Sequence, residues 1–573
     1  MNTARAIYVL IVFSTAGLIF LSCSGYSTTQ LLNAEFVTVN KDLSPIDLLA
    51  PSDKSVSTKN PKLVWSRRAG AISYSVEMSA QSDFSSLLLK KSTTETSYSL
   101  NNGDLISITT LDSFSYYWRV KAIYADQQVT SESFLFHVLD DTIVYVSSAS
   151  TASDQVGNRS APFKKIQSGI EAADTKRNGV ATTPMFVYVA GGSYTEEVNL
   201  KPGISIYGGY SSTDWSRNTT SNVTALTGPT EIGLRSSGTV TTAFRSTTVV
   251  DGLDISGGSG STNSIAVQLD PGASPTITNN ILRGKAGNVY SYGVRTSDAC
   301  PCSPIISNNT ILGGNAPNTN YGIYIWSATS PISINNNIIS GGTAGTSQGL
   351  SLKNSTAVTI SNNVIMGGSG TTNYAIYLST SSPTVFNNTI NGGTTGSVFA
   401  IYMTDTSNSA NLRNNILFNS TGTGSCIHEA IGGMTPSAVQ ANNFFGCPTF
   451  YQDNVTGAVT NLTTSVITGA GTNTLAFFGN TNIDNATPTA GQLFVDIDGA
   501  DNNLATIADN DWHLADPGAA TTCNILFGGQ NLSGTLTTDR DAILRTATLP
   551  SVAPCSGNVT NGGTGWSMGA YEK

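Results

Sequence analysis

Few side chains in this 573-residue sequence could carry out acid–base chemistry. It has 3 His and 37 Asp plus Glu, against 28 Lys plus Arg. Across the central stretch 255–430 the acidic residues are Asp270, Asp298, Asp405 and Glu429. Catalysis by paired carboxylates needs two such groups within about 5–9.5 Å. Asp405, His428 and Glu429 are our candidate catalytic residues, provided that the fold brings them together.

A second acidic group lies nearer the C-terminus. Asp496, Asp498 and Asp501 offer oxygen atoms of the kind that calcium binds. The spacing is not that of an EF-hand, because Gly499 comes too early and no Glu closes the loop. Turns rich in Asp and Asn are the interpretation that we favour. We therefore expect no cofactor, with calcium at these three residues as the alternative.

The elements that position these residues follow from a repeat. A hexapeptide, apolar-x-Asn-Asn-x-apolar, has its first Asn at positions 279, 308, 336, 362, 387, 414 and 442. The copies are therefore about 27 residues apart. A nearly fixed period of this length is typical of a solenoid. Each unit also holds a second short strand and Gly turns without helical spacing, so its strands must pair with those of the next unit. The sequence predicts an all-β fold whose main part is a parallel β-helix.

Asn at a fixed corner tolerates left-handed backbone angles and can hydrogen-bond to the Asn stacked above and below it. This pattern resembles the right-handed, pectate-lyase-like β-helix family, whose signature includes such an Asn ladder. The resemblance implies a right-handed β-helix, a fold in which many relatives cut polysaccharides on one outer face. The clustered Asp residues of pectate lyases and the Gly-His-Gly of polygalacturonases do not occur here. Fold alone does not establish an activity.

One outward row is predicted from the alternating strand of each coil. Successive coils stack about 4.8 Å apart, so equivalent residues form a line. The row has no carboxylate and consists of Gln268, Arg295, Tyr324, Ser351, Tyr377, Tyr402 and His428. We predict ligand binding by Arg295, Tyr324, Tyr377, Tyr402 and His428, with the rings on sugars and Arg295 on an acidic group. The alternative is that these rings only stack on neighbouring coils.

Residues 1–22 read as an export signal. Arg5 precedes the apolar run Ala6–Leu21, which is short for a transmembrane helix of about 20 residues. Phe20-Leu21-Ser22-Cys23 resembles a bacterial lipobox, which implies lipidation of Cys23. The alternative is an ordinary signal peptide cut near Ser22 or Ser24. We expect residues 23–43 to form a polar tether.

The other six cysteines favour disulfides, since an even number in an exported chain indicates a disulfide framework. Pairing by sequence proximity gives Cys300–Cys302, Cys426–Cys447 and Cys523–Cys555. A zinc site is the other interpretation, but no His lies at ligand spacing from these residues.

A small β-sandwich is predicted over residues 44–140. The pattern Pro61-x-Leu63-x-Trp65, followed by Tyr74-x-Val76 and Tyr117-Trp118-Arg119-Val120, resembles a fibronectin type III module. We expect Trp65 and Trp118 in its core. Beyond it we place a β-helix cap and entry coils at 141–250, the repeats at 251–485 and a C-terminal capping region at 486–573.

Composition narrows the function. Only 11% of the residues are charged and the formal net charge is −9, which excludes a basic nucleic-acid binder. We expect a monomeric, lipid-anchored protein of the bacterial cell envelope, at the outer membrane, the surface or the periplasmic face. The leading function is non-catalytic, adhesin-like binding of a glycan or an extracellular-matrix ligand. The alternatives are a lyase or glycoside hydrolase acting on an acidic polysaccharide, and a structural envelope protein.

Overall fold

The computed structural model describes residues 41–462 with short gaps, parts of 483–545, and residues 566–571. The predicted signal and Cys23 lie outside the described residues. The chain divides into two compact units, residues 1–111 with 116–137, and residues 112–115 with 138–573. Among the described residues, no helix is long and apolar enough to cross a membrane.

The first unit consists of antiparallel strands in two sheets. One has the order β1-β3-β6, and the other has the order β2-β9-β7-β4-β5 with β8 paired to β7. The strands are β1 (Leu48–Ala50), β2 (Ser55–Ser57), β3 (Lys62–Trp65), β4 (Ser73–Ser79), β5 (Leu89–Thr93), β6 (Ser97–Ser99), β7 (Ser115–Ile123), β8 (Gln128–Thr130) and β9 (Phe134–Val138). Trp65 and Trp118 are buried, as predicted. This unit is therefore sandwich-like, with both tryptophans in its interior.

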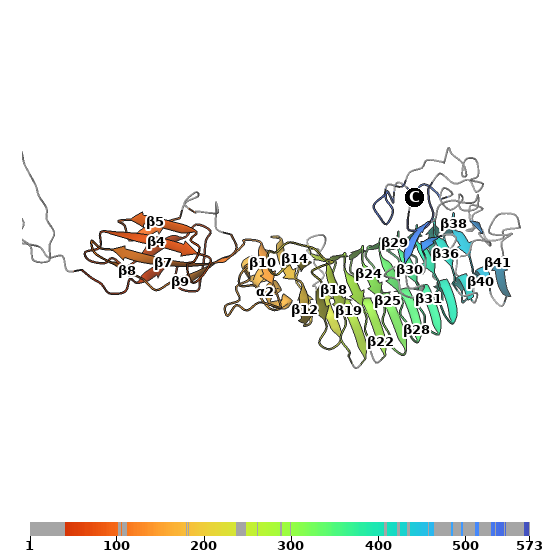
Figure 1. Ribbon diagram of the computed structural model, residues 1–573. Helices are drawn as coiled ribbons and strands as arrows, with labels where there is room; N and C mark the ends of the chain where they lie inside the picture. The colour runs from red at the N-terminus through yellow and green to blue at the C-terminus, as the bar shows by residue number, and fades with distance from the viewer. Residues whose placement is uncertain are drawn as a thin grey trace, which may run out of the picture. The chain divides into compact units, whose positions relative to one another are not determined.

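The second unit is built from three parallel sheets, and each coil of the chain contributes one strand to each sheet (Figure 1). The first sheet contains β10 (Ile143–Val146), β11 (Met185–Ala190), β14 (Ile204–Tyr210), β17 (Val249–Asp251), β20 (Thr276–Thr278), β23 (Ile305–Ser307), β26 (Ile332–Asn335), β29 (Val358–Ser361), β32 (Thr384–Phe386), β35 (Asn411–Arg413) and β38 (Ala438–Gln440). The second sheet contains β12 (Gly192–Thr195), β15 (Thr224–Thr227), β18 (Leu253–Ser256), β21 (Ile281–Arg283), β24 (Thr310–Leu312), β27 (Ile338–Ser340), β30 (Val364–Met366), β33 (Thr389–Asn391), β36 (Ile416–Phe418), β39 (Asn443–Phe445) and β42 (Ile483–Asp484).

The third sheet has the longest strands, and in Figure 1 several of them appear as green arrows side by side. It contains β13 (Val198–Leu200), β16 (Ile232–Ser236), β19 (Asn263–Leu269), β22 (Tyr290–Thr296), β25 (Thr319–Trp326), β28 (Thr346–Lys353), β31 (Thr372–Ser379), β34 (Ser397–Met403), β37 (Gly424–Glu429), β40 (Thr449–Val455) and β41 (Ala458–Leu462). All its pairings are parallel except the last, between β40 and β41. The prediction of a parallel β-helix is confirmed.

A helix packs against the first coils. Helix α2 (Ile166–Lys176) buries Ile166, Gly169, Ile170 and Ala173. Its first two backbone N–H groups donate to the Glu196 carboxylate, at 2.8 and 3.1 Å. A carboxylate at a helix N-terminus also favours the helix dipole. Glu196 therefore acts as the cap of α2 from a distant part of the sequence.

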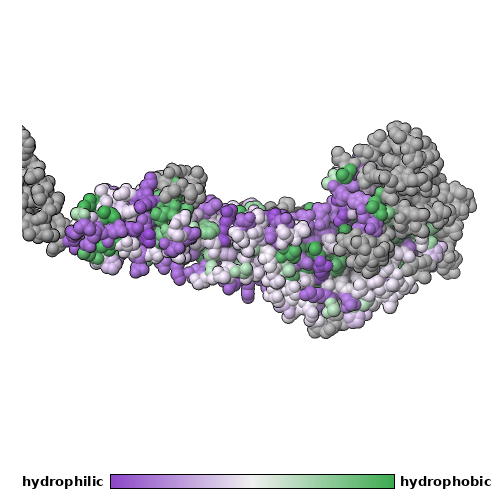
Figure 2. All heavy atoms as spheres, viewed as in Figure 1, coloured by the Kyte–Doolittle hydropathy of each residue, from purple (hydrophilic) through white to green (hydrophobic). Residues whose placement is uncertain are grey.

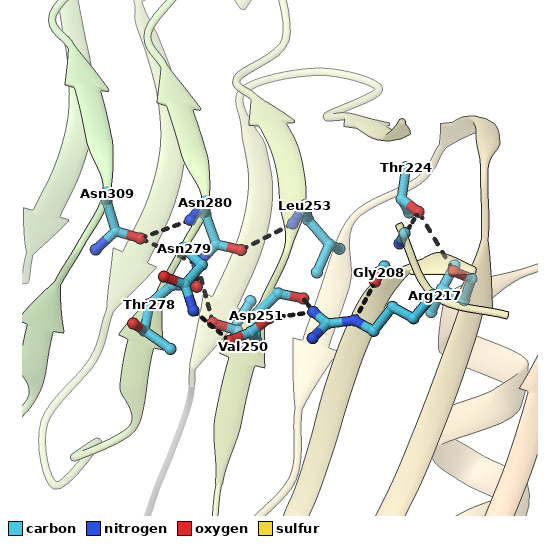
Figure 3. Close-up of polar contacts among 12 residues, drawn as sticks. Gly208, Arg217, Thr224, Val250, Asp251, Leu253, Thr278, Asn279, Asn280 and Asn309 are labelled. Carbon is cyan, nitrogen blue, oxygen red and sulfur yellow. Dashed lines mark hydrogen bonds and ion pairs between the residues drawn. The ribbon is translucent and has the colours of Figure 1, made fainter. Parts of the chain in front are cut away.

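The two asparagines of the repeat have different roles. The first, as at Asn279 and Asn308, has a left-handed backbone with φ 56°. The second is buried inside the turn: the Asn309 carboxamide oxygen accepts from the Asn280 backbone N–H at 3.0 Å, and Asn309 Nδ2 donates to the Ile277 and Ser307 carbonyls. This inner ladder continues through Asn337, Asn363, Asn388, Asn415 and Asn442. Figure 3 shows its first rungs, beginning where Asn280 accepts from Leu253.

The last copy of the repeat is shifted by one residue from the predicted alignment. Ala441 has the left-handed backbone, with φ 52°, and Asn442 is the inner rung bound by Asn415. Asn442 therefore corresponds to the second Asn of the other copies, whereas the sequence pattern placed it as the first. The physical reason is that the second position needs an amide, because its side chain bonds the neighbouring turns, while the corner tolerates Ala.

Two of the three expected disulfides fall on described residues, and both are confirmed. Cys300–Cys302 and Cys426–Cys447 are bonded, and all four residues are buried. The third expected pair, Cys523–Cys555, lies outside the described residues.

The described part of the C-terminal region packs along the side of the coils. Strands β43 (Phe494–Asp496) and β44 (Asp511–Leu514) form an antiparallel pair. Phe494, Trp512 and Tyr571 share an apolar cluster with outward side chains of the second sheet, such as Met366 and Phe418. Outer asparagines also bind its backbone: Asn414 exchanges two hydrogen bonds of 2.8 Å with Gln530. This region therefore covers the later strands of the second sheet.

An imidazole joins two parts of this cover. His513 Nδ1 lies 2.5 Å from an Asp511 carboxylate oxygen, and Nε2 lies 2.6 Å from one of Asp541. The ring also contacts that of Tyr571, with centroids 4.2 Å apart. Both nitrogens can donate only when the ring is protonated. Burial opposes the charge on His513, but the two carboxylates outweigh it and raise its pKa.

We expect this contact to make stability depend on pH. Because the folded-state pKa of His513 lies above its ordinary value of 6.5, the contribution is complete below that value and is lost as the pH rises through the folded-state pKa. The melting temperature should therefore fall as the pH rises above 6.5. His513→Gln should flatten this slope, as followed by thermal melts at stepped pH. An unchanged slope in the variant would show that other groups cause it.

Candidate functional site

The predicted outward row exists as a continuous register on the third sheet. Strand pairing places Gln268 beside Arg295, Arg295 beside Tyr324, and Tyr324 beside Ser351. The line continues through Tyr377, Tyr402 and His428. Inward neighbours such as Ile323 and Ile376 are fully buried in the core. The sequence pattern therefore identified which side chains line up on this outer face.

A second outward row, which the sequence analysis missed, lies next to the first. It contains Tyr292, Tyr321, Gln348, Tyr374 and Phe399. Each precedes a first-row residue by three positions instead of two. The extra position is a small residue, such as Gly322, which precedes the large inward residue of the strand. At Gly322 an added Cβ would lie 2.5 Å from the Gly349 carbonyl oxygen. The recurrence of Gly or Ala at this position in successive coils could have revealed the second row. A pattern that assumes strict two-residue alternation does not detect it.

The rings of both rows form two clusters, separated at β28. The first ring cluster consists of Tyr290, Tyr292, Tyr321, Tyr324 and Trp326. The second ring cluster consists of Tyr374, Tyr377, Phe399, Tyr402 and His428. Strand β28 contributes Gln348 and Ser351 between them. Both are buried, and Gln348 Oε1 and Ser351 Oγ have no hydrogen-bond partner among the described residues.

Within each cluster the rings stack along the β-helix axis. Tyr292 and Tyr321 have centroids 4.9 Å apart and an interplanar angle of 4°, and Tyr402 and His428 have 4.8 Å and 3°. Ring faces that cover one another are not available to a ligand, so this surface presents mainly ring edges and hydroxyls. Tyr324 is only 7% exposed. Stacking between coils therefore accounts for much of the aromatic content, as the alternative interpretation held.

The side chains of the second ring cluster are half-buried, as are Tyr290 and Trp326 of the first. Burial raises the pKa of Tyr374 to about 12, so its hydroxyl stays protonated at neutral pH. Burial lowers the pKa of His428, so its imidazole is neutral there. Tyr374, Tyr402 and His428 therefore offer neutral hydrogen-bonding groups.

Two cations on the same face have no carboxylate partner among the described residues. The Arg295 guanidinium lies 5.1 Å from the Tyr292 ring centroid, and Lys353 Nζ lies 5.7 Å from that of Tyr324. By contrast, Arg235 at the start of the row is paired with Glu197 at 3.1 Å and Asp270 at 3.0 Å. The sequence analysis missed Lys353, which lies two positions beyond the row residue Ser351. Arg295 and Lys353 can therefore attract an anion to the first ring cluster.

The candidate catalytic residues are not brought together. His428 and Glu429 are adjacent in β37, and adjacent strand residues point to opposite faces. His428 lies on the outer face, whereas Glu429 is fully buried and in register with the core residue Met403. Asp405 accepts hydrogen bonds from Ser379 and Thr404 beyond the end of β34. These positions do not form one reaction centre.

The candidate calcium ligands are mostly outside the described residues. Asp496 lies on β43 and is exposed, while Asp498 and Asp501 are not described. Among the described residues, no group of three or more His, Cys, Asp or Glu side chains is placed to hold a metal ion.

An open pocket of about 540 Å³ lies at the N-terminal end of the third sheet. Glu197, Glu231 and Arg235 line it. The Glu231 carboxylate accepts a hydrogen bond of 3.0 Å from the Asn263 backbone. The sequence analysis missed these two glutamates because they precede the regular repeats. In the view of Figure 2 the described coils present mainly residues of intermediate to low hydropathy.

Comparison with known proteins supports the fold class. Residues 288–445 match the family model described as "Right handed beta helix region". With the parallel sheets described above, this defines the second unit as a right-handed parallel β-helix. The comparison with curated proteins gives no match.

Solved structures give distant similarities only. A complex of XylC with xylose is 10% identical with a TM-score of 0.26, over 48% of this chain and 53% of that one, so about half of XylC is covered. Pectate lyase PelI from Erwinia chrysanthemi, in complex with tetragalacturonic acid, is 12% identical with a TM-score of 0.12, over 73% and 93%. The catalytic unit of a GH87 α-1,3-glucanase from Streptomyces thermodiastaticus is 12% identical with a TM-score of 0.20, over 69% and 88%. These values say nothing about the activity of this chain.

Proposed function

We propose that this protein is a non-catalytic, glycan-binding protein of the bacterial cell envelope, whose ligand is an anionic polysaccharide. The observation that carries the proposal is the pair Arg295 and Lys353, which are half-buried beside tyrosine rings and have no carboxylate partner among the described residues. The two lie on coils two steps apart, or about 9.6 Å along the axis. Carboxylate or sulfate groups on successive sugars could contact both.

The second ring cluster extends this surface toward later coils. Its half-buried tyrosine hydroxyls and the neutral His428 can hydrogen-bond sugar hydroxyls, and ring edges can pack against sugar C–H groups. A β-helix presents such groups at a constant spacing, which suits a polymer with a repeating unit. Of the five predicted ligand-binding residues, Arg295, Tyr377, Tyr402 and His428 are therefore proposed as direct contacts, and Tyr324 is not.

The remaining parts of the proposal concern placement in the envelope. Lipidation at Cys23 would anchor the chain, and the sandwich, as a fibronectin type III-like module, would act as a spacer. These roles rest on the lipobox-like and module-like sequence patterns. An adhesin that binds an extracellular-matrix glycan is one form of the same proposal.

Cleavage of an acidic polysaccharide is the alternative, favoured by the pocket that Glu197 and Glu231 line. An array of acidic and neutral glycans, run beside assays for new reducing ends and for unsaturated products, separates the two. We expect the unaltered protein to retain acidic glycans and to form no product. The variants Asp405→Ala, His428→Ala and Glu231→Gln should likewise form none. Product that disappears in any of these variants would establish an enzyme instead. Absence of retention on the whole array would contradict the binding function.

A further inference from the structure

The interior of the β-helix changes character in its last coils. One inward column runs through Ile325, Leu352, Leu378 and Met403 in register, and the next residue in line is Glu429. Asp453 follows Gln452, the register partner of His428, and therefore lies beside Glu429 on the next coil. Glu429 is 0% exposed and Asp453 is 5% exposed. Two carboxyl groups thus replace aliphatic side chains inside the fold.

The polar groups around Glu429 do not satisfy it. The Tyr451 hydroxyl donates a hydrogen bond to Glu429 Oε1. Glu429 Oε2 is buried and accepts no hydrogen bond from a described donor, and the second polar group in contact with Glu429 is the Asp453 carboxyl. Buried carboxylates in proteins are paired or coordinate metals, and among the described residues no cationic side chain acts on Glu429.

We propose that Glu429 and Asp453 bind a calcium ion inside the last coils of the β-helix. Two carboxylates can supply up to four hard oxygen ligands, and a double positive charge neutralises both. The Tyr451 hydroxyl lies against the site, and water can complete the coordination that Ca²⁺ requires. The ion ties β37 to β40, where the regular inner core ends. This site is independent of the glycan-binding face and of the predicted cluster Asp496, Asp498 and Asp501.

Terbium titration of the full chain tests the site. Tb³⁺ replaces Ca²⁺ at oxygen sites and emits when a nearby tyrosine is excited, and Tyr451 is in place to sensitise it. We expect emission that CaCl₂ displaces and that falls at least tenfold in Glu429→Gln and in Asp453→Asn. Asp405→Asn, on the preceding coil, and Asp496→Asn, in the predicted cluster, are matched controls and should retain it.

A melting experiment covers the case in which a variant does not fold. CaCl₂ should raise the melting temperature of the unaltered protein above its value in a chelator, and Asp453→Asn should lose that increase. Absence of terbium emission from the unaltered protein, or emission that persists in both carboxylate variants, would overturn the site. So would a melting temperature that CaCl₂ does not change. Glycan retention should be the same with and without chelator. The calcium site is therefore tested separately from the proposed function.

Discussion

Asn309→Ala is expected to lower the free energy of unfolding by about 3 kcal/mol, whereas Asn308→Ala should lower it by only about 1 kcal/mol. The Asn309 side chain is a buried rung: it accepts from the backbone and side chain of Asn280 and donates to Ile277, Ser307 and Asn337. Its loss leaves several buried backbone groups without a partner. Asn308 is exposed, and its substitution mainly strains a left-handed corner.

Thermal melts of the two adjacent variants provide the comparison. Asn308→Gly is the matched control for the corner, because Gly adopts a positive φ without strain, and it should be close to neutral. The melting temperature of Asn309→Ala should lie well below those of both position-308 variants. Equal losses at 308 and 309 would show that the inner ladder contributes little beyond the turn itself.

Combined Arg295→Ala and Lys353→Ala substitution is expected to weaken binding of an acidic polysaccharide by roughly a hundredfold. Hydrogen bonds to charged groups contribute about 1.5–3 kcal/mol each, and about 1.4 kcal/mol is a factor of ten in affinity. Both side chains lie at the ring surface and have no carboxylate partner among the described residues, so their loss does not orphan a buried acid. Titration calorimetry at low ionic strength measures the change.

Arg413→Ala is the matched control for this variant, because Arg413 belongs to β35 on the first sheet and not to the proposed glycan-binding face on the third. It removes a positive charge from the same β-helix and should leave the affinity unchanged. High salt should lower the affinity of the unaltered protein for the polysaccharide toward that of the double variant, because salt screens exposed charges. If Arg413→Ala weakens binding as much as the double variant, attraction is non-specific and the assigned face is wrong.

The sequence predicted the coil register, the outward row and the first two disulfides. All of these depend on local periodicity that recurs once per coil, so a single chain carries many copies of the signal. The sequence does not predict that the two asparagines of each repeat have different structural roles, because the two residues are of the same type. Only the structure shows that Asn308 lies outside the turn and Asn309 inside it.

The rest depends on contacts between residues far apart in the chain. The second row is displaced by the small residues at Gly322 and its equivalents, and this defeats a two-residue alternation. Glu429 is in register with the core residue Met403, and this register places its side chain in the interior. The sequence interpretation instead grouped Glu429 with His428 as a catalytic candidate, because both residue types can transfer protons. The packing of Trp512 against Phe418 joins residues about a hundred positions apart, and no local pattern predicts it.

Electrophoresis through gels that contain an acidic polysaccharide tests the central claim most directly. The full chain should be retarded in a gel with polygalacturonate and should migrate freely when the same polymer has its carboxyl groups reduced to alcohols. Arg295→Ala with Lys353→Ala should migrate freely in both gels. Equal retardation in the acidic and the reduced gel, or none in either, would contradict recognition of an anionic glycan by this face.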